Sequence, residues 1–200
     1  MRFRLQVIVD QYRPIEELAK LFADGVDCIQ VRIRDESTLR LVEYTSAIVE
    51  VCHARGVIAL VNRRLDVVLA TEAQGVQLPS NGFRPSEVRR VASDLLIGSS
   101  VHSIDKAIRA ANDGTDSITF GHVFASGSHP SDPPRGVEML RNIVDVVDVP
   151  IVAIGGIGPR NVELVREAGA TSISVIGAIW NAHESERTKI VQLLRKGIEG

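Results

Sequence analysis

The feature that most constrains this chain is a regular alternation between short, β-branched apolar runs and longer segments with the apolar period of an amphipathic helix. Eight runs are predicted to be strands: Leu5–Val9, Cys28–Arg32, Val57–Val61, Gly75–Leu78, Leu95–Ser99, Ser117–Phe120, Ile151–Ile154 and Ser172–Ile176. Helices are predicted at Pro14–Ala23, Thr38–Ala54, Arg64–Glu72, Arg84–Ala92, Ile104–Asn112, Val137–Val146, Pro159–Glu167 and Glu184–Lys196. Such alternation is typical of βα units that share one parallel sheet.

Turn-forming residues support this division of the chain. Pro14 and Pro159 stand where helices are expected to begin, and glycines stand where helices should end, at Gly25, Gly56, Gly114 and Gly169. No GxGxxG motif follows the first strand, so closure of eight equivalent units is a simpler solution than an open doubly wound sheet. Without a linker or a change of composition, residues 1–200 are predicted to form one α/β domain, a (β/α)8 TIM barrel.

Composition and charge exclude several function classes. The chain is 44% hydrophobic and 24% charged, as expected of a globular protein, and its formal net charge is −2 with scattered basic residues. These values argue against a nucleic-acid partner. No apolar stretch is long enough to span a bilayer and Met1–Leu5 does not resemble a signal peptide, so we expect no membrane partner. Cys28 and Cys52 form no CxxC pair and are predicted to be reduced core thiols of a cytoplasmic protein.

In such a barrel the functional groups lie at the C-terminal ends of the strands. The windows Ala153–Ile157 and Val175–Ile179 end the last two strands with glycines. Backbone N–H groups near glycine can approach an oxyanion closely, so a phosphate site is predicted there. Its members are Gly155, Gly156, Gly177 and Ala178. The alternative is that these glycines only form tight turns.

Alternation along the second strand places Gln30, Arg32 and Arg34 on one face. Arginines that face a barrel interior need an anionic ligand or an internal partner, because an isolated buried charge is strongly unfavourable. For Arg32, contact with a ligand and an internal salt bridge remain equal alternatives. For Arg34, nearer the mouth, plain exposure to solvent is a further alternative.

The sixth strand is followed by Gly121 and His122, which places an imidazole at the mouth. An imidazole can both accept and donate a proton near neutral pH, so His122 is a candidate general acid/base; a structural histidine is the alternative. No HxH, HExxH or carboxylate cluster has metal-ligand spacing, so neither a metal nor a cofactor is predicted. The Gly-, Ser- and Pro-rich loop 126–136 is interpreted either as a lid or as a solvated surface loop.

Six segments in this order resemble the thiamine phosphate synthase superfamily over nearly the whole chain. They are Gln30–Arg34, Val61–Arg63, Gly75–Leu78, Ile97–His102, Phe120–Phe124 and Ala153–Ile157. The superfamily contains a synthase, which joins a pyrimidine pyrophosphate to a thiazole phosphate using magnesium. It also contains a thiazole tautomerase, which aromatises a carboxythiazole phosphate. Both imply a phosphorylated thiazole as small-molecule partner and a homodimer.

Departures from the synthase pattern separate these two activities. Arg63 follows Asn62 where the synthase pattern has an Asn-Asp pair, and the second metal-binding acid is missing from Leu78–Gly82. Arg34 and His129 stand where the synthase has lysines, and His122 stands where it has proline. Because magnesium needs carboxylates or substrate phosphates, the resemblance implies a metal-independent thiazole tautomerase, an isomerase of thiamine biosynthesis.

This implied isomerase would convert the dihydrothiazole carboxylate phosphate released by thiazole synthase into 2-(2-carboxy-4-methylthiazol-5-yl)ethyl phosphate. His122 would be its catalytic acid/base, and Arg32 or Arg34 would pair with the carboxylate. Further substrate contacts are assigned to Gln30, Asn62, Gln77, Ser100 and Gly136. Two alternatives are a thiamine phosphate synthase whose metal-binding acids come from elsewhere, and a non-catalytic regulatory barrel that binds a phosphorylated metabolite.

Overall fold

Eight parallel strands form one closed barrel in the computed structural model, which describes residues 3–127 and 131–200. Their order around the barrel is their order in the sequence. The strands are β1 Leu5–Val9, β2 Cys28–Val31, β3 Ile58–Asn62, β4 Gly75–Leu78, β5 Leu96–Val101, β6 Ser117–Gly121, β7 Ile151–Ile154 and β8 Ser172–Val175. The predicted (β/α)8 barrel is therefore confirmed.

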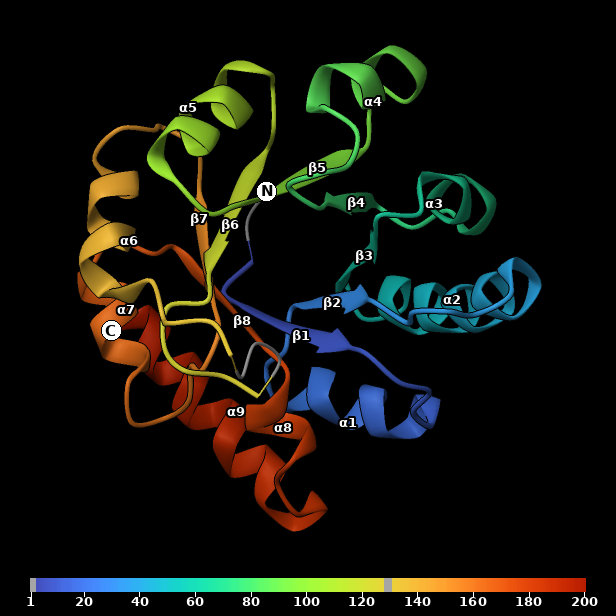
Figure 1. Cartoon of the computed structure of the whole chain (residues 1–200). Coiled ribbons are helices and arrows are strands. Elements are labelled where there is room, and N and C mark those ends of the chain that lie inside the picture. Colours follow the sequence, from blue (N-terminus) through green and yellow to red (C-terminus); the bar gives the residue numbers. More distant parts are fainter. Residues whose placement is uncertain (1–2, 128–130) are drawn as a thin grey trace.

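Helices surround this ring of strands, as Figure 1 shows. They are α1 Ile15–Asp24, α2 Thr38–His53, α3 Leu65–Thr71, α4 Pro85–Val91, α5 Ile104–Asn112, α6 Gly136–Val144, α7 Val162–Glu167, α8 Gly177–Trp180 and α9 Glu184–Glu199. The short α8 was expected only as an apolar turn after the last strand. None of the helices in the described ranges is long and apolar enough to cross a membrane.

Several element boundaries differ from the sequence-based ones. β3 begins one residue late, and β5 extends to Val101. The predicted helix at Pro159 begins only at Val162, because residues 158–161 form a turn before it. The Asn161 side chain holds that turn: its Oδ1 accepts from the Gly158 amide at 2.8 Å, and its Nδ2 donates to the Gly156 carbonyl at 3.0 Å.

The barrel has an outer and an inner core. Outward residues of the strands, such as Ile29 and Val31, pack with the helices in the large hydrophobic core. A smaller cluster of Phe3, Cys28, Leu60 and Val152 lies apart from it, and Ile58 and Leu96 pack against this cluster. Since Cys28, Gln30 and Arg32 alternate along one face of β2, the interior changes from apolar to polar toward the strand C-termini. This polar end is where a site can form.

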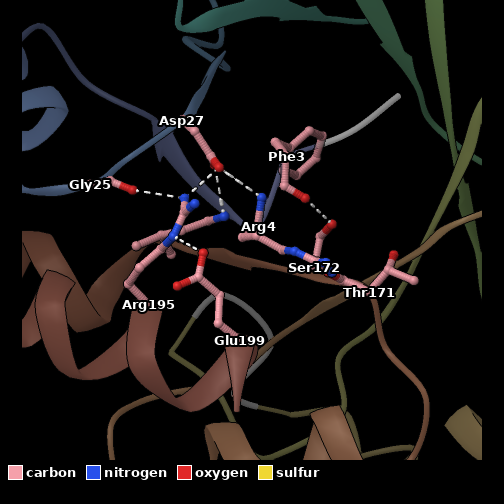
Figure 2. A network of polar contacts seen from close by, with 9 residues as sticks. Phe3, Arg4, Gly25, Asp27, Thr171, Ser172, Arg195 and Glu199 are labelled. Carbon is pink, nitrogen blue, oxygen red and sulfur yellow. Dashed lines mark hydrogen bonds and ion pairs between the residues drawn. The ribbon is translucent and has the colours of Figure 1, made fainter.

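The N-terminal ends of the strands are tied together by polar contacts around Asp27, drawn in Figure 2. Its carboxylate accepts hydrogen bonds from the Arg4 amide, at 3.0 and 3.1 Å, and from the Leu5 amide at 2.9 Å. It also pairs with Arg195 on α9, whose Nε bonds to Glu199 at 2.6 Å. This network joins β1, the start of β2 and the last helix on the face opposite the mouth.

Candidate active site

A cavity of about 1090 Å³ opens at the C-terminal ends of the strands. The structure brings nearly all predicted site residues into its lining: Gln30, Arg32, Arg34, Asn62, Gln77, Ser100, His122, Gly155, Gly156, Gly177 and Ala178. Gly136 is the exception, since it does not line the cavity and its amide donates to the Val123 carbonyl at 3.0 Å. These residues lie together because the C-terminal ends of the strands meet around one cavity.

Two hydrogen-bonded groups of amide and hydroxyl side chains form the inner wall of the cavity. Gln30 Nε2 donates to Asn62 Oδ1 at 3.2 Å, which joins the ends of β2 and β3. Gln77 Nε2 donates to Ser100 Oγ at 3.0 Å, and Thr119 Oγ1 donates to Gln77 Oε1 at 3.3 Å, which joins β4, β5 and β6. Because these groups are fixed by one another, they present ordered polar atoms to a ligand.

His122 is buried beside the connection from β6 to α6. Its Nε2 lies 3.2 Å from the carbonyl oxygen of Asp132, and its own carbonyl accepts from the Arg135 amide at 2.9 Å. Arg135 Nε also donates to the Gly121 carbonyl at 3.1 Å. These contacts hold the described part of the connection against the end of β6.

The predicted lid corresponds to this same connection. Ser126, Gly127, Asp132 and Arg135 line the cavity. Residues 128–130, which include His129, lie outside the described residues, so the lid remains a prediction.

The ends of β7 and β8 form the glycine-rich side of the mouth. Gly155 and Gly156 have φ angles of 100° and 65°, a left-handed backbone that suits glycine. Gly177 and Ala178 are the first residues of α8, where amide groups lack intrahelical acceptors. This side can therefore offer backbone N–H donors to an anion, and its use as a phosphate site remains a prediction.

Arginines form another side of the mouth, at the ends of β2 and β3. Arg32 is half-buried: burial and then the neighbouring Arg34 lower the pKa of its guanidinium, while Asp10 raises it. Among the described residues no carboxylate oxygen lies within 4.0 Å of either guanidinium group. Of the two interpretations of Arg32, the geometry in this part of the chain therefore favours contact with an anionic ligand.

Sequence reasoning missed several cavity-lining residues. They include Asp10, Asp35, Glu36, Arg63, Arg64, His102, Thr119, Arg135 and Ser174. Alternation along β8 could have indicated Ser174, whose buried Oγ has no hydrogen-bond partner among the described residues. Arg63 could have been recognised from the sequence in another way, because it stands where the synthase pattern has an aspartate.

Magnesium, which the resemblance to the synthase implies, does not fit the side chains at the ends of β3 and β4. The described residues contain no group of three or more His, Cys, Asp or Glu side chains that could hold a metal ion. Arg63 follows β3, and the loop Pro79–Gly82 after β4 contains no acid. Magnesium requires hard oxygen ligands, usually carboxylates, and a fixed guanidinium at this place would repel it.

A closed barrel with a polar cavity at its strand C-termini defines the class of this protein, the (β/α)8 barrels whose site is built from the βα loops. A family model described as thiamine monophosphate synthase matches residues 5–179. The chain therefore belongs to the thiamine monophosphate synthase family, and it is an enzyme of that family.

Individual relatives agree with this assignment over their whole length. A thiamine-phosphate synthase of Pyrococcus abyssi is 35% identical over 200 residues, covering 99% of this chain and 96% of the relative. One from Methanoculleus marisnigri is 37% identical over 205 residues, with the same coverage. The solved structure of a thiamine phosphate pyrophosphorylase from Pyrococcus furiosus superposes with a TM-score of 0.89 at 32% identity, covering 98% of this chain and 95% of that one.

The prediction of a thiazole tautomerase is wrong in the light of these relatives. All three carry the name of the synthase or pyrophosphorylase, and none carries the name of an isomerase. The prediction rested on a few substitutions, chiefly His122 and Arg63, and gave them more weight than similarity along the full chain. The alternative of a thiamine phosphate synthase is better supported.

Proposed function

We propose that this chain is a transferase that joins a pyrimidine pyrophosphate to a thiazole phosphate and releases pyrophosphate. In this reaction the lone pair of the thiazole nitrogen attacks the carbon that bears the pyrophosphate. The bond from that carbon to oxygen breaks, and its electron pair leaves with the pyrophosphate. No proton moves in this step, so a general acid/base is not required.

The observation that carries the proposal is the presence of anion-suited groups on two separate sides of one cavity. The arginines follow β2 and β3, whereas the glycines follow β7 and β8. In a closed barrel of eight strands, β3 and β7 are four positions apart and face each other across the mouth. Two anionic substrates can therefore bind with their uncharged rings between them, as a two-substrate transfer needs.

Each side of the cavity has its own role in this scheme. Backbone amides of Gly155, Gly156, Gly177 and Ala178 would hold the phosphate of the thiazole. Arg32 and Arg34 would bind the pyrophosphate and stabilise the charge that grows on it as the bond breaks. Two side-chain pairs that line the inner wall, Gln30 with Asn62 and Gln77 with Ser100, would orient the rings.

In this proposal His122 lines the cavity and holds the connection from β6 to α6, rather than transferring a proton. Its Nε2 contact with the Asp132 carbonyl, at 3.2 Å, supports that role. The start of this connection contacts the side of the mouth where the thiazole phosphate would bind, since the Phe124 amide donates to the Gly155 carbonyl at 3.0 Å.

The proposal is tested by incubating the purified chain with both substrates and measuring thiamine phosphate and released pyrophosphate. We expect the two products in equal amounts, and none when either substrate is omitted. Reactions with magnesium and with a chelator are run in parallel. Absence of product in both would contradict the proposal, and tight binding of the substrates without turnover would support the regulatory barrel instead.

A further inference from the structure

We infer that the guanidinium groups of Arg32, Arg34 and Arg63 neutralise the bound diphosphate in place of a divalent cation. The inference rests on the proposed function for the identity of the ligand. It starts from the disagreement described above: the guanidinium of Arg63 stands where the resemblance to the synthase implies a carboxylate that binds magnesium.

The backbone brings these three arginines to one side of the mouth. β2 and β3 are parallel, and their register pairs Val31 with Val61, so Arg32 and Asn62 follow at the same level. The hydrogen bond from Gln30 to Asn62 fixes the two strand ends together. Arg63 follows directly, and all three arginines line the cavity.

Within the described part of the chain these charges form no salt bridge, although Asp10 favours the charged form of Arg32 and raises its pKa. No carboxylate oxygen lies within 4.0 Å of Arg32, Arg34 or Arg63, and the side-chain contact of Arg63 is with the neutral Asn81, at 3.0 Å. Asp35, next to Arg34 in the sequence, forms no salt bridge among the described residues, and Glu36 is engaged by Arg40 at 3.5 Å and by the Ser37 amide. The three guanidinium groups therefore repel one another, and a ligand with several negative charges would relieve this repulsion.

Arg64 provides an internal contrast. It also lines the cavity, but its guanidinium forms two bonds to Asp66, at 2.8 and 2.5 Å, and one to Thr38 Oγ1 at 2.9 Å. Its charge is already paired within the protein, so we assign it no part in binding the diphosphate. Pairing with a carboxylate of the protein therefore distinguishes Arg64, which stabilises the fold, from the arginines that we assign to the ligand.

Arginine chemistry suits this task. A guanidinium group is planar, always charged and able to donate two parallel hydrogen bonds to phosphate oxygens. Three such groups can neutralise a diphosphate without the ordered water shell that magnesium usually keeps. Binding of the diphosphate is then expected to be insensitive to chelators.

The test uses inorganic pyrophosphate as probe and isothermal titration calorimetry as readout. We expect the unaltered chain to bind pyrophosphate in the presence of a chelator, with no gain in affinity when magnesium is added. Arg63→Ala should weaken binding roughly tenfold or more, since it removes hydrogen bonds between charged groups. Binding that appears only with magnesium, or an affinity unchanged by Arg63→Ala, would overturn the inference.

Arg55→Ala is the matched control. Arg55 is exposed and precedes β3, whereas Arg63 follows the same strand at its other end. Its substitution should leave pyrophosphate binding unchanged. Arg63 has a φ of 67°, a left-handed conformation that is similarly unfavourable for arginine and for alanine. The variant is therefore expected to fold. A thermal melt of each variant checks this.

Failure of the inference and failure of the proposed function give different results. If product forms with magnesium but not with a chelator, the inference is wrong and the transferase stands. If pyrophosphate binds through Arg63 with the chelator present but no product ever forms, the transferase is wrong and the arginine site stands. The variant Arg63→Asp extends the test, because a metal-independent site should lose pyrophosphate binding with this acid in place whether or not magnesium is present.

Discussion

Gly155 lies directly against His122, so that a Cβ atom built on Gly155 would be 2.2 Å from the Cβ of His122 and 2.5 Å from its Cα. The two residues directly follow neighbouring strands, β6 and β7. The Val123 amide, just beyond His122, donates to the Ile154 carbonyl at 2.9 Å. A glycine at position 155 is therefore what lets the end of β6 approach the predicted phosphate side of the mouth.

Gly155→Ala should accordingly damage both the fold and the site. The new methyl group cannot avoid the backbone of His122, and the φ of 100° is unfavourable for alanine, so we expect a loss of about 1–3 kcal/mol in the free energy of unfolding. Affinity for thiazole phosphate should fall as well. Urea unfolding and calorimetry measure the two effects. Gly158→Ala, in the same loop with no atom within 4 Å of its new methyl group, is the control. Equal behaviour of the two variants would contradict this account.

Arg32→Met is expected to separate binding from stability. Arg32 is half-buried, and burial together with the neighbouring Arg34 lowers the pKa of its guanidinium despite the opposing effect of Asp10, so the charge is unfavourable in the ligand-free protein. Methionine keeps an unbranched chain without the charge. The melting temperature should stay equal or rise, while pyrophosphate affinity falls roughly tenfold. A lower melting temperature with unchanged affinity would instead assign Arg32 to the fold; Arg55→Met controls for loss of a distant charge.

The barrel could be predicted from sequence because each strand carries its own apolar signal and each helix its own period. Alternation alone predicts Gln30, Arg32 and Arg34 on one face of the second strand, and all three line the cavity, although β2 itself ends at Val31. Strand ends were less predictable, because they depend on neighbouring strands. β3, for example, ends where the Arg63 amide turns to the Gln77 carbonyl of β4, at 2.9 Å.

The site was predicted only in part, for a related reason. Residues on strands follow a period, but loop residues depend on contacts that no local pattern reveals. Arg135 reaches the cavity because its Nε bonds to the Gly121 carbonyl and its Nη1 to the His102 carbonyl. Gly136 was expected at the ligand and instead begins α6. Activity was misjudged because a single histidine at the mouth fits more than one chemistry.

Asp27 is expected to contribute more to stability than an exposed ion pair does. It accepts from the amides of Arg4 and Leu5 and pairs with Arg195 (Figure 2), and an amide in its place would turn an NH₂ group toward these donors. Asp27→Asn should lower the free energy of unfolding by about 1.5–3 kcal/mol, as for hydrogen bonds to charged groups. The control is Glu184→Gln, since Glu184 pairs with Lys20 at 2.8 Å on the exposed surface and its substitution should cause no measurable change. If urea unfolding showed a similar loss of free energy for both variants, Asp27 would not contribute more than an exposed ion pair.

The Cys52 thiol should make the fold sensitive to alkaline pH. Burial raises the pKa of Cys52 to about 12, from a usual value of 9.0. Between these values the unfolded chain releases the thiol proton and the folded chain keeps it, so the free energy of unfolding falls as pH rises. The slope from one such group approaches about 1.4 kcal/mol per pH unit. The free energy of unfolding, measured with urea across this pH range, should therefore fall more steeply in the unaltered chain than in Cys52→Ala. Cys28 and the other titrating groups are common to both chains, so the difference in slope reports Cys52. Parallel curves would show that the two states bind the Cys52 proton equally.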